Sequence, residues 1–178
     1  INMKQIRIHG RGGQGVVTAA ELIAIAAYQE GKHAQAFPSF GVERTGAPIE
    51  AFARIDDQPI RTREHVYEPD VLIIQDASLI GTVDVTKGCR PTTLIIVNST
   101  KPKEEIKLNS RPEYLFVIDA TKIALEEIGR NIVNTVILGA VAKATGFFTL
   151  ESLKKAVEEK FGDKGPELVE KNIKAVTK

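Results

Sequence analysis

The sequence predicts an α/β protein with a three-layer, Rossmann-like fold, in which a mostly parallel sheet carries helices on both faces. An apolar strand over residues 5–9 runs into a glycine-rich loop and an alanine-rich helix over residues 14–30, which is a β-loop-α unit. Further apolar runs, each bounded by polar residues, indicate central parallel strands that are covered on both faces; they are residues 71–74, 93–97 and 114–118.

The first half of the chain supplies the outer part of this sheet. The expected helix over residues 14–30 is apolar almost all round, so it should be largely buried. A second strand is expected over residues 33–37. Residues 49–55 alternate in polarity like a strand, and the turn-like residues 56–59 follow. We therefore expect residues 60–63 to return as a short antiparallel partner, which adds a hairpin to the sheet.

The second half of the chain supplies most of the helices. One helix is expected over residues 121–129, and Asn134 or Thr135 should cap another that runs to about residue 145. Apolar residues at helical spacing then mark two amphipathic helices. The first is marked by Leu150, Leu153, Val157 and Phe161, and the second by Leu168, Val169, Ile173 and Val176.

Polar residues follow each of the apolar strands. They are Gln75 and Asp76, residues 98–100, and residues 119–121. Because an open α/β sheet binds its ligands at the carboxyl ends of its strands, we expect these residues to lie along a ligand crevice.

Composition limits the classes of partner. The 178 residues predict a single domain over residues 3–178, and Ile1 and Asn2 are expected to be left over from cloning. Twenty-four basic and 23 acidic residues give a net charge of +1, which does not favour nucleic acid or an anionic membrane as partner. No apolar run is long enough to span a membrane. Because Cys89 is the single cysteine, the chain can form neither an internal disulfide nor a four-cysteine cluster, which fits the cytoplasm.

The glycine-rich loop is the strongest candidate binding site. Its glycines free the backbone to approach a ligand, and the following helix directs unpaired N–H groups and its positive dipole end at the same place. The spacing also matches a G-x-G-x-x-G motif, which predicts a phosphate cradle. The alternative is that the glycines only let the helix pack closely on the sheet. The loop consists of Gly10, Arg11, Gly12, Gly13, Gln14 and Gly15.

The known phosphate motifs match this loop only in part. A classical NAD site needs an acidic residue at the end of the second strand, but no carboxylate appears there before Glu43. A Walker A loop would need Lys-Ser or Lys-Thr after Gly15. The pattern therefore favours a phosphate or pyrophosphate cradle that lacks the NAD specificity residue.

Few residues suit catalysis, and we assign no catalytic or metal-ligating residue to this chain. The three histidines lie far apart, and Cys89 lies in a turn without a histidine to activate it. Ser39 lacks the G-x-S-x-G pattern of a nucleophile. Arg44, with Thr45 beside it, suits a phosphate or carboxylate. An ion pair from Arg44 to a nearby glutamate or to a partner chain is the alternative.

Several separated motifs resemble the gamma subunit of the 2-oxoacid:ferredoxin (flavodoxin) oxidoreductases. They are His-Gly-Arg-Gly-Gly-Gln-Gly at 9–15, Ala-Phe-Pro-Ser-Phe-Gly-Val-Glu-Arg-Thr-Gly-Ala-Pro at 36–48, Asp-Ala-Thr at 119–121, and Asn-Ile-Val-Asn-Thr at 131–135 with Leu138-Gly139. The resemblance therefore spans nearly the whole chain. The Glu-Arg-Thr-Gly-Ala-Pro segment is more similar to pyruvate-type enzymes than to 2-oxoglutarate-type enzymes.

The resemblance implies that the chain works inside a complex with alpha, beta and delta subunits. Such a complex splits a 2-oxoacid oxidatively, releases CO2, passes electrons to ferredoxin or flavodoxin and transfers the acyl group to coenzyme A. Thiamine diphosphate and iron–sulfur clusters are expected on the partner subunits, and none is expected on this chain.

The resemblance also implicates the glycine loop in holding coenzyme A. Residues 11–15 would then bind its phosphates through backbone N–H groups, and Arg11 would add charge. Ser39, Arg44 and Thr45 would lie across the crevice and hold the ligand or the partner chains.

Two other functions stay open at this point. The chain could be a purely structural docking subunit of the same complex, or a stand-alone dinucleotide-binding oxidoreductase. The isolated chain is expected to be inactive, and an uncovered apolar interface would allow it to form a homodimer.

Overall fold

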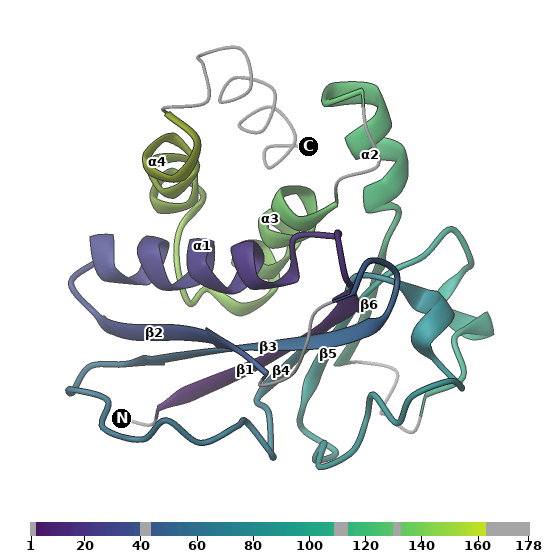
Figure 1. The fold of residues 1–178 in the computed structure, drawn as a ribbon, viewed down its shortest axis with the longest axis horizontal. Helices are drawn as coiled ribbons and strands as arrows, with labels where there is room; N and C mark the ends of the chain where they lie inside the picture. Colours follow the sequence, from purple (N-terminus) through teal and green to yellow (C-terminus); the bar gives the residue numbers. More distant parts are fainter. Residues whose placement is uncertain (1–2, 40–43, 109–113, 130–132, 163–178) are drawn as a thin grey trace.

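A computed structural model of the chain describes residues 3–39, 44–108, 114–129 and 133–162, and Figure 1 shows how the elements are arranged. Six strands form one sheet in the order β2-β3-β1-β4-β5-β6. The strands are β1 (Lys4–Arg11), β2 (His33–Pro38), β3 (Pro48–Asp56), β4 (Val71–Ile74), β5 (Leu94–Asn98) and β6 (Leu115–Ile118). These six strands were all predicted, and their predicted ends lie within two residues of the observed ones. The seventh predicted strand, the return strand over residues 60–63, is the exception.

The sheet is mostly parallel, as predicted, but its antiparallel element differs from the expected hairpin. β1, β4, β5 and β6 pair in parallel, whereas β3 runs antiparallel to both β1 and β2. Residues 57–63 form no strand, so the predicted return strand over 60–63 is wrong. Since β1 occupies one edge of β3 and β2 the other, β3 has no free edge for a returning strand to join.

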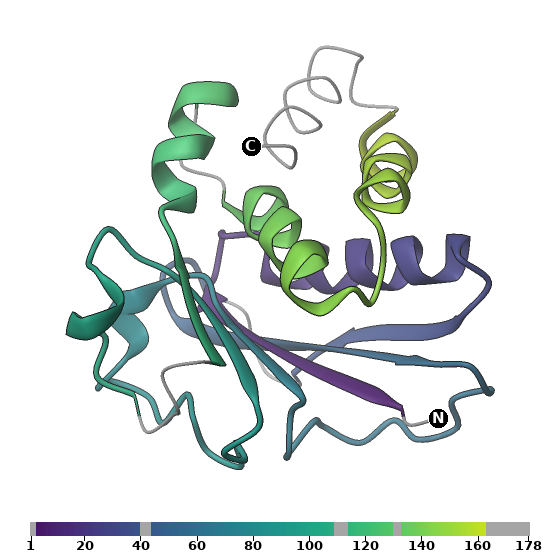
Figure 2. The ribbon, with the colours of Figure 1, turned by 180° about the vertical axis from the view of Figure 1, so that it is seen from behind.

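The described helices are α1 (Val16–Gln29), α2 (Ala120–Glu127), α3 (Asn134–Thr145) and α4 (Leu150–Phe161). Figures 1 and 2 show from opposite sides that they lie on the same face of the sheet. The main core fills the space between them and the sheet, and it includes Leu22, Ile23, Ile137 and Leu153 with no exposed area. The prediction that α1 is largely buried is confirmed.

The other face of the sheet is covered by irregular chain. Side chains alternate along β4, so Ile73 faces the helices while Leu72 and Ile74 belong to a second, smaller cluster. Leu79, in the 3-10 turn η1 (Ala77–Leu79), and Val85 complete this cluster. The expected helical layer on this face is therefore not observed among the described residues. The expected last helix, from Leu168 onward, lies outside them.

The start of α3 also differs from the prediction. Val133 takes the N-cap position without a side-chain hydrogen bond, so neither Asn134 nor Thr135 caps the helix. The Asn134 side chain points elsewhere because its Nδ2 donates to the Gly15 carbonyl at 3.3 Å. This contact ties the start of α3 to the glycine loop.

The burial of α4 against α1 should contribute much of the stability of the helical layer. Leu153 is completely buried, whereas Leu125 in α2 is 52% exposed. Leu153→Ala should lower the free energy of unfolding by about 2–5 kcal/mol, because it leaves a cavity in the core. Leu125→Ala makes the same chemical change at the surface and should cost no more than about 0.5 kcal/mol. Urea unfolding followed by circular dichroism measures both, and equal losses would contradict this account of the core.

Candidate functional site: the glycine loop and the cleft beside it

The glycine loop joins the end of β1 to the start of α1. Gly13 and Gly15 have φ angles of +91° and +70°, which residues with a side chain rarely adopt. Gly15 is the N-cap of α1, and among the described residues the helix start has no side-chain cap hydrogen bond. The helix therefore presents its N-terminal N–H groups without a side-chain cap, as an anion site would require.

The glycines also allow three close contacts inside the protein. A Cβ atom on Gly10 would lie 2.5 Å from the Val16 side chain. On Gly12 it would lie 2.1 Å from the backbone oxygen of Arg44, and on Gly15 it would lie 2.5 Å from Asn134 Nδ2. These contacts favour the alternative that the glycines permit close packing. Packing and anion binding are compatible only in part, because Arg11, Gly12 and Gln14 already donate their backbone N–H groups to Gln14 Oε1, Ala47 O and Arg11 O. The predicted cradle of residues 11–15 is therefore reduced to the N–H groups of Gly13, Gly15 and the first turn of α1.

The segment before β3 lies against the glycine loop. Gly12 donates its N–H to Ala47 O at 2.8 Å, and Gly46 donates to Gly12 O at 3.0 Å. Gly12 and Thr45 form an isolated β-bridge. Thr45 therefore lies next to the glycine loop. It was predicted to lie across a crevice from the loop, but the two segments are in direct backbone contact.

Arg44 and Ser39 relate differently to the loop. The Arg44 side chain is exposed and makes no ion pair with Glu50, while Glu43 lies outside the described residues. Ser39 donates its N–H to Glu50 O in β3 at 3.0 Å. Because β3 lies between β2 and β1, Ser39 is about two strand spacings, or roughly 10 Å, from β1.

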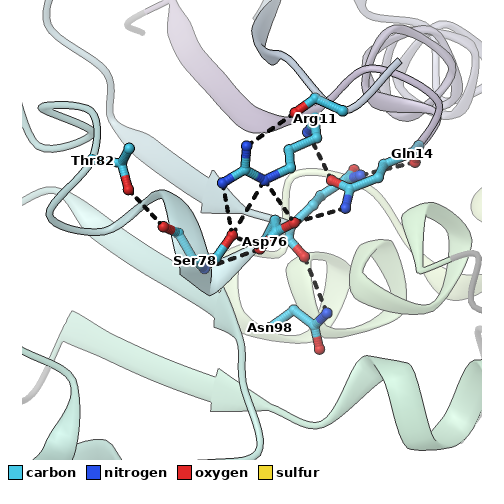
Figure 3. Close-up of polar contacts among 8 residues, drawn as sticks. Arg11, Gln14, Asp76, Ser78, Thr82 and Asn98 are labelled. Carbon is cyan, nitrogen blue, oxygen red and sulfur yellow. Dashed lines mark hydrogen bonds and ion pairs between the residues drawn. The ribbon is translucent and has the colours of Figure 1, made fainter.

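Arg11 and Gln14 are held by the segment after β4 (Figure 3). The Arg11 guanidinium donates to Ser78 Oγ at 2.9 and 3.2 Å and to Gly46 O at 3.0 Å, and it lies 3.3 Å from Asp76 Oδ2. Gln14 Nε2 donates to the same Asp76 oxygen at 2.9 Å. Burial alone would raise the pKa of Asp76, but the hydrogen bonds from Ser78 and Gln14 and the charge of Arg11 lower it below its usual value. Asp76 is therefore the anion that fixes both side chains.

A cleft of about 760 Å³ lies beside the loop. As predicted, polar residues at the carboxyl ends of the strands line it: Gln75 and Asp76 after β4, residues 98–100 at the end of β5, and Thr121 at the start of α2. Asp119 and Ala120, which were predicted with them, do not line this cleft, and Lys101 does. Among the residues predicted to bind a ligand, Gln14 is the one that lines this cleft.

Asn98 organises the inner wall of the cleft. Its Nδ2 donates to Gln75 O and to Thr121 Oγ1, both at 3.0 Å, and its Oδ1 accepts from the N–H groups of Ala120 and Thr121. One amide therefore joins the ends of β4 and β5 to the start of α2.

Sequence reasoning placed Gln75, Asp76 and Asn98 at the crevice but did not foresee their contacts. It missed Ser78 and the contact of Asn134 with the glycine loop altogether. For Gln75 the sequence did carry a signal, because a polar residue directly after a fully apolar strand is often buried and must then find a hydrogen-bond partner. Ser78 and Asn134 carry no such signal.

Behind the loop, His9 is 3% exposed and accepts a hydrogen bond from Arg7 Nε at its Nε2, with a separation of 3.0 Å. Burial and the charge of Arg7 lower the pKa of His9 to about 3. Burial also raises the pKa of the Cys89 thiol, so the structure gives no sign of an activated nucleophile there. Among the described residues, no His, Cys, Asp and Glu side chains gather as a metal site, and no helix has the length and apolarity to cross a membrane.

His9 should make the stability of the chain depend on pH. The unfolded histidine takes up a proton near pH 6.5, whereas the folded one does so only near pH 3, so protons favour the unfolded state between these values. Lowering the pH from 7 to 5 should reduce the free energy of unfolding by about 2 kcal/mol through this group. Urea titrations at several pH values measure the effect. His9→Gln should remove this part of the pH dependence, whereas His33→Gln, at an exposed position, should retain it.

Comparison with known proteins identifies the family. The family model described as pyruvate ferredoxin/flavodoxin oxidoreductase matches residues 5–178. The common subunit gamma of the pyruvate/ketoisovalerate oxidoreductases of Thermococcus kodakarensis is 57% identical over 97% of this chain and 93% of the relative. The pyruvate synthase subunit PorC of Methanosarcina barkeri is 56% identical over 87% of this chain and 85% of the relative.

Solved structures show the same fold. The pyruvate oxidoreductase subunit PORC of Thermotoga maritima is 37% identical and superposes with a TM-score of 0.82, covering 99% of this chain and 94% of that one. The 2-oxoglutarate:ferredoxin oxidoreductase of Magnetococcus marinus is 22% identical, with a TM-score of 0.78 over 99% of this chain and 30% of that one, and it shows the fold alone. This chain belongs to the pyruvate ferredoxin/flavodoxin oxidoreductase family, as a gamma subunit.

Proposed function

We propose that the chain positions coenzyme A in a pyruvate-type 2-oxoacid:ferredoxin oxidoreductase, which converts a 2-oxoacid and coenzyme A into acyl-coenzyme A, CO2 and reduced ferredoxin or flavodoxin. Alpha, beta and delta subunits would complete the enzyme and would carry the thiamine diphosphate and the iron–sulfur clusters. The family supports the reaction, and the Magnetococcus marinus relative was solved with coenzyme A bound.

One observation carries the role of the loop. Gly15 caps α1 without a side-chain hydrogen bond, so the N–H groups of the first turn are available for the phosphates of coenzyme A. The Arg11 contacts with Gly46 and Ser78 use three N–H groups of a guanidinium that has five. Arg11 can therefore keep these partners and still donate to a phosphate.

In this role the chain supplies orientation. A phosphate group fixed at α1 would hold the far end of coenzyme A, so that its thiol reaches the acyl intermediate on the partner chains. Exposed Arg44 and Thr45 lie next to the loop and would contact the ligand or those partner chains. Ser39 lies beyond β3, so contact with a partner chain suits it better. Selection of the 2-oxoacid would then rest with other subunits, in keeping with a Thermococcus relative named as common to pyruvate and ketoisovalerate enzymes.

Arg11→Ala should weaken coenzyme A binding by the assembled complex about tenfold or more, because a hydrogen bond to a charged group is lost. Isothermal titration calorimetry gives the dissociation constant. Ser78→Ala removes an anchor of the arginine but leaves its charge, so its effect should be smaller. Arg63→Ala, at an exposed position away from the loop, is the matched control and should leave the affinity unchanged. Unchanged affinity with Arg11→Ala would rule out the charge contribution.

A docking subunit without ligand contact is the second candidate, since the packing of Gly10, Gly12 and Gly15 within the chain explains these glycines without a ligand. It predicts that Arg11→Ala lowers the yield of assembled complex on size-exclusion chromatography, while the complex that forms binds coenzyme A normally. Gly12→Val cannot separate the two candidates, because its side chain would clash with the Arg44 backbone in either case.

A further inference from the structure

Gln75 is a buried amide at the edge of the cleft. It directly follows β4, is 1% exposed and is one of the residues that line the cleft. Its backbone is fixed on both sides, since its N–H donates to His9 O at 2.8 Å and its carbonyl accepts from Asn98 Nδ2 at 3.0 Å. The side chain therefore starts from a rigid position next to the glycine loop.

The orientation of the Gln75 amide follows from a hydrogen bond of its side chain to the glycine loop. Nε2 donates to the Gln14 carbonyl at 3.1 Å. A backbone carbonyl can only accept, so the nitrogen must face the loop and the oxygen must face away from it. That oxygen, Oε1, is buried and has no hydrogen-bond partner among the described residues.

Asn134, at the start of α3, makes the same kind of contact with the loop. Its Nδ2 donates to Gly15 O at 3.3 Å, and its Oδ1 is likewise buried without a partner. The two amides thus hold successive carbonyl groups of the loop. They differ in one respect, because Gln75 lines the cleft and Asn134 does not.

A buried acceptor without a partner costs free energy, so such an atom usually marks the place of a missing donor. We propose that Gln75 Oε1 accepts a hydrogen bond from an N–H group of the ligand that occupies the cleft. This inference rests on the proposed function, in which the phosphates of the same ligand lie at the start of α1. The ligand class is then a phosphate ester that carries an amide or amino N–H group within reach of the cleft.

Coenzyme A offers this chemistry in two places. Its pantetheine arm carries two amide N–H groups, and its adenine base carries an amino group. The other cleft residues suit a polar ligand, because they supply hydroxyl groups, cations and apolar contacts. They include Ser99, Thr100, Lys101, Lys107, Ile80 and Ile106.

The test compares the affinities of the assembled complex for coenzyme A and for analogues that lack one donor. Deaminated coenzyme A removes the amino group of the base, and analogues with an ester in place of one pantetheine amide remove each amide N–H. Calorimetry gives every dissociation constant without turnover. The wild-type complex should bind one of these analogues roughly three- to tenfold more weakly than coenzyme A, and that analogue identifies the donor.

Gln75→Met should abolish this preference, because it removes the acceptor with little change in size. Asn134→Leu is the matched control: it also frees a loop carbonyl, so it can weaken the binding of all ligands, but the preference should persist. If the wild type binds every analogue as tightly as coenzyme A, or if the preference survives Gln75→Met, the inference is overturned. A wild-type series that shows no preference overturns the inference even if the Gln75 variant does not assemble.

The outcomes also separate this inference from the proposed function. If Arg11→Ala weakens coenzyme A binding while Gln75→Met leaves the preference intact, only the role of Gln75 fails. If neither the Arg11 variant nor the Gln75 variant alters any dissociation constant, neither side chain contributes to coenzyme A binding, and the roles proposed for Arg11 and Gln75 fail together.

Discussion

The close backbone approach at Gly12 is the contact on which the outer half of the sheet depends. A side chain there would lie 2.1 Å from Arg44 O, so only glycine lets this segment reach the loop. The hydrogen bonds of Gly12 with Gly46 and Ala47 then bring the chain to the start of β3, beside the end of β1. β3 therefore pairs with β1 along its whole length, and β2 is left at the edge. One glycine thus shapes both the candidate site and the strand order.

Two buried arginines hold the face of the sheet that carries no described helix. Arg7 donates to the carbonyl groups of Val66, Tyr67, Val85 and Lys87, with separations from 2.7 to 3.4 Å. Arg54 binds Gln5, Gln35 and the carbonyl of His65. Irregular segments have many backbone carbonyls that are not used in secondary structure, and a guanidinium can satisfy several of them at once. These contacts explain how irregular segments can cover this face of the sheet in place of helices.

The parts of the fold that depend on local pattern were predictable, and those that depend on distant pairing were not. The apolar runs predicted β4, β5 and β6, and the stripe of Leu150 and Leu153 predicted α4, because burial selects side chains at a fixed spacing. The place of β3 between β1 and β2 depends on Gly12 meeting residues 44–47, which no local signal reveals. The sequence also did not reveal that helices cover only one face of the sheet, because a strand is equally apolar whether helices or buried loops cover it. At the site, the polar strand ends located the cleft, but the contacts of Asn134 and Ser78 required the folded geometry.

The electrostatics of the site favour recognition by fixed dipoles over recognition by net charge. Asp76 lies 3.3 Å from Arg11 and compensates much of its charge, and the chain as a whole carries a net charge of only +1. A phosphate attracted by a strongly basic patch would bind tightly in many orientations. A phosphate held by the N–H groups of α1, with a second hydrogen bond at a buried amide, would bind in one orientation. The proposed role is to place the thiol of coenzyme A next to an acyl intermediate on another chain, and for this role a single orientation matters more than tight binding. The N–H groups at the start of α1 and the rigidly held Gln75 would together provide that orientation.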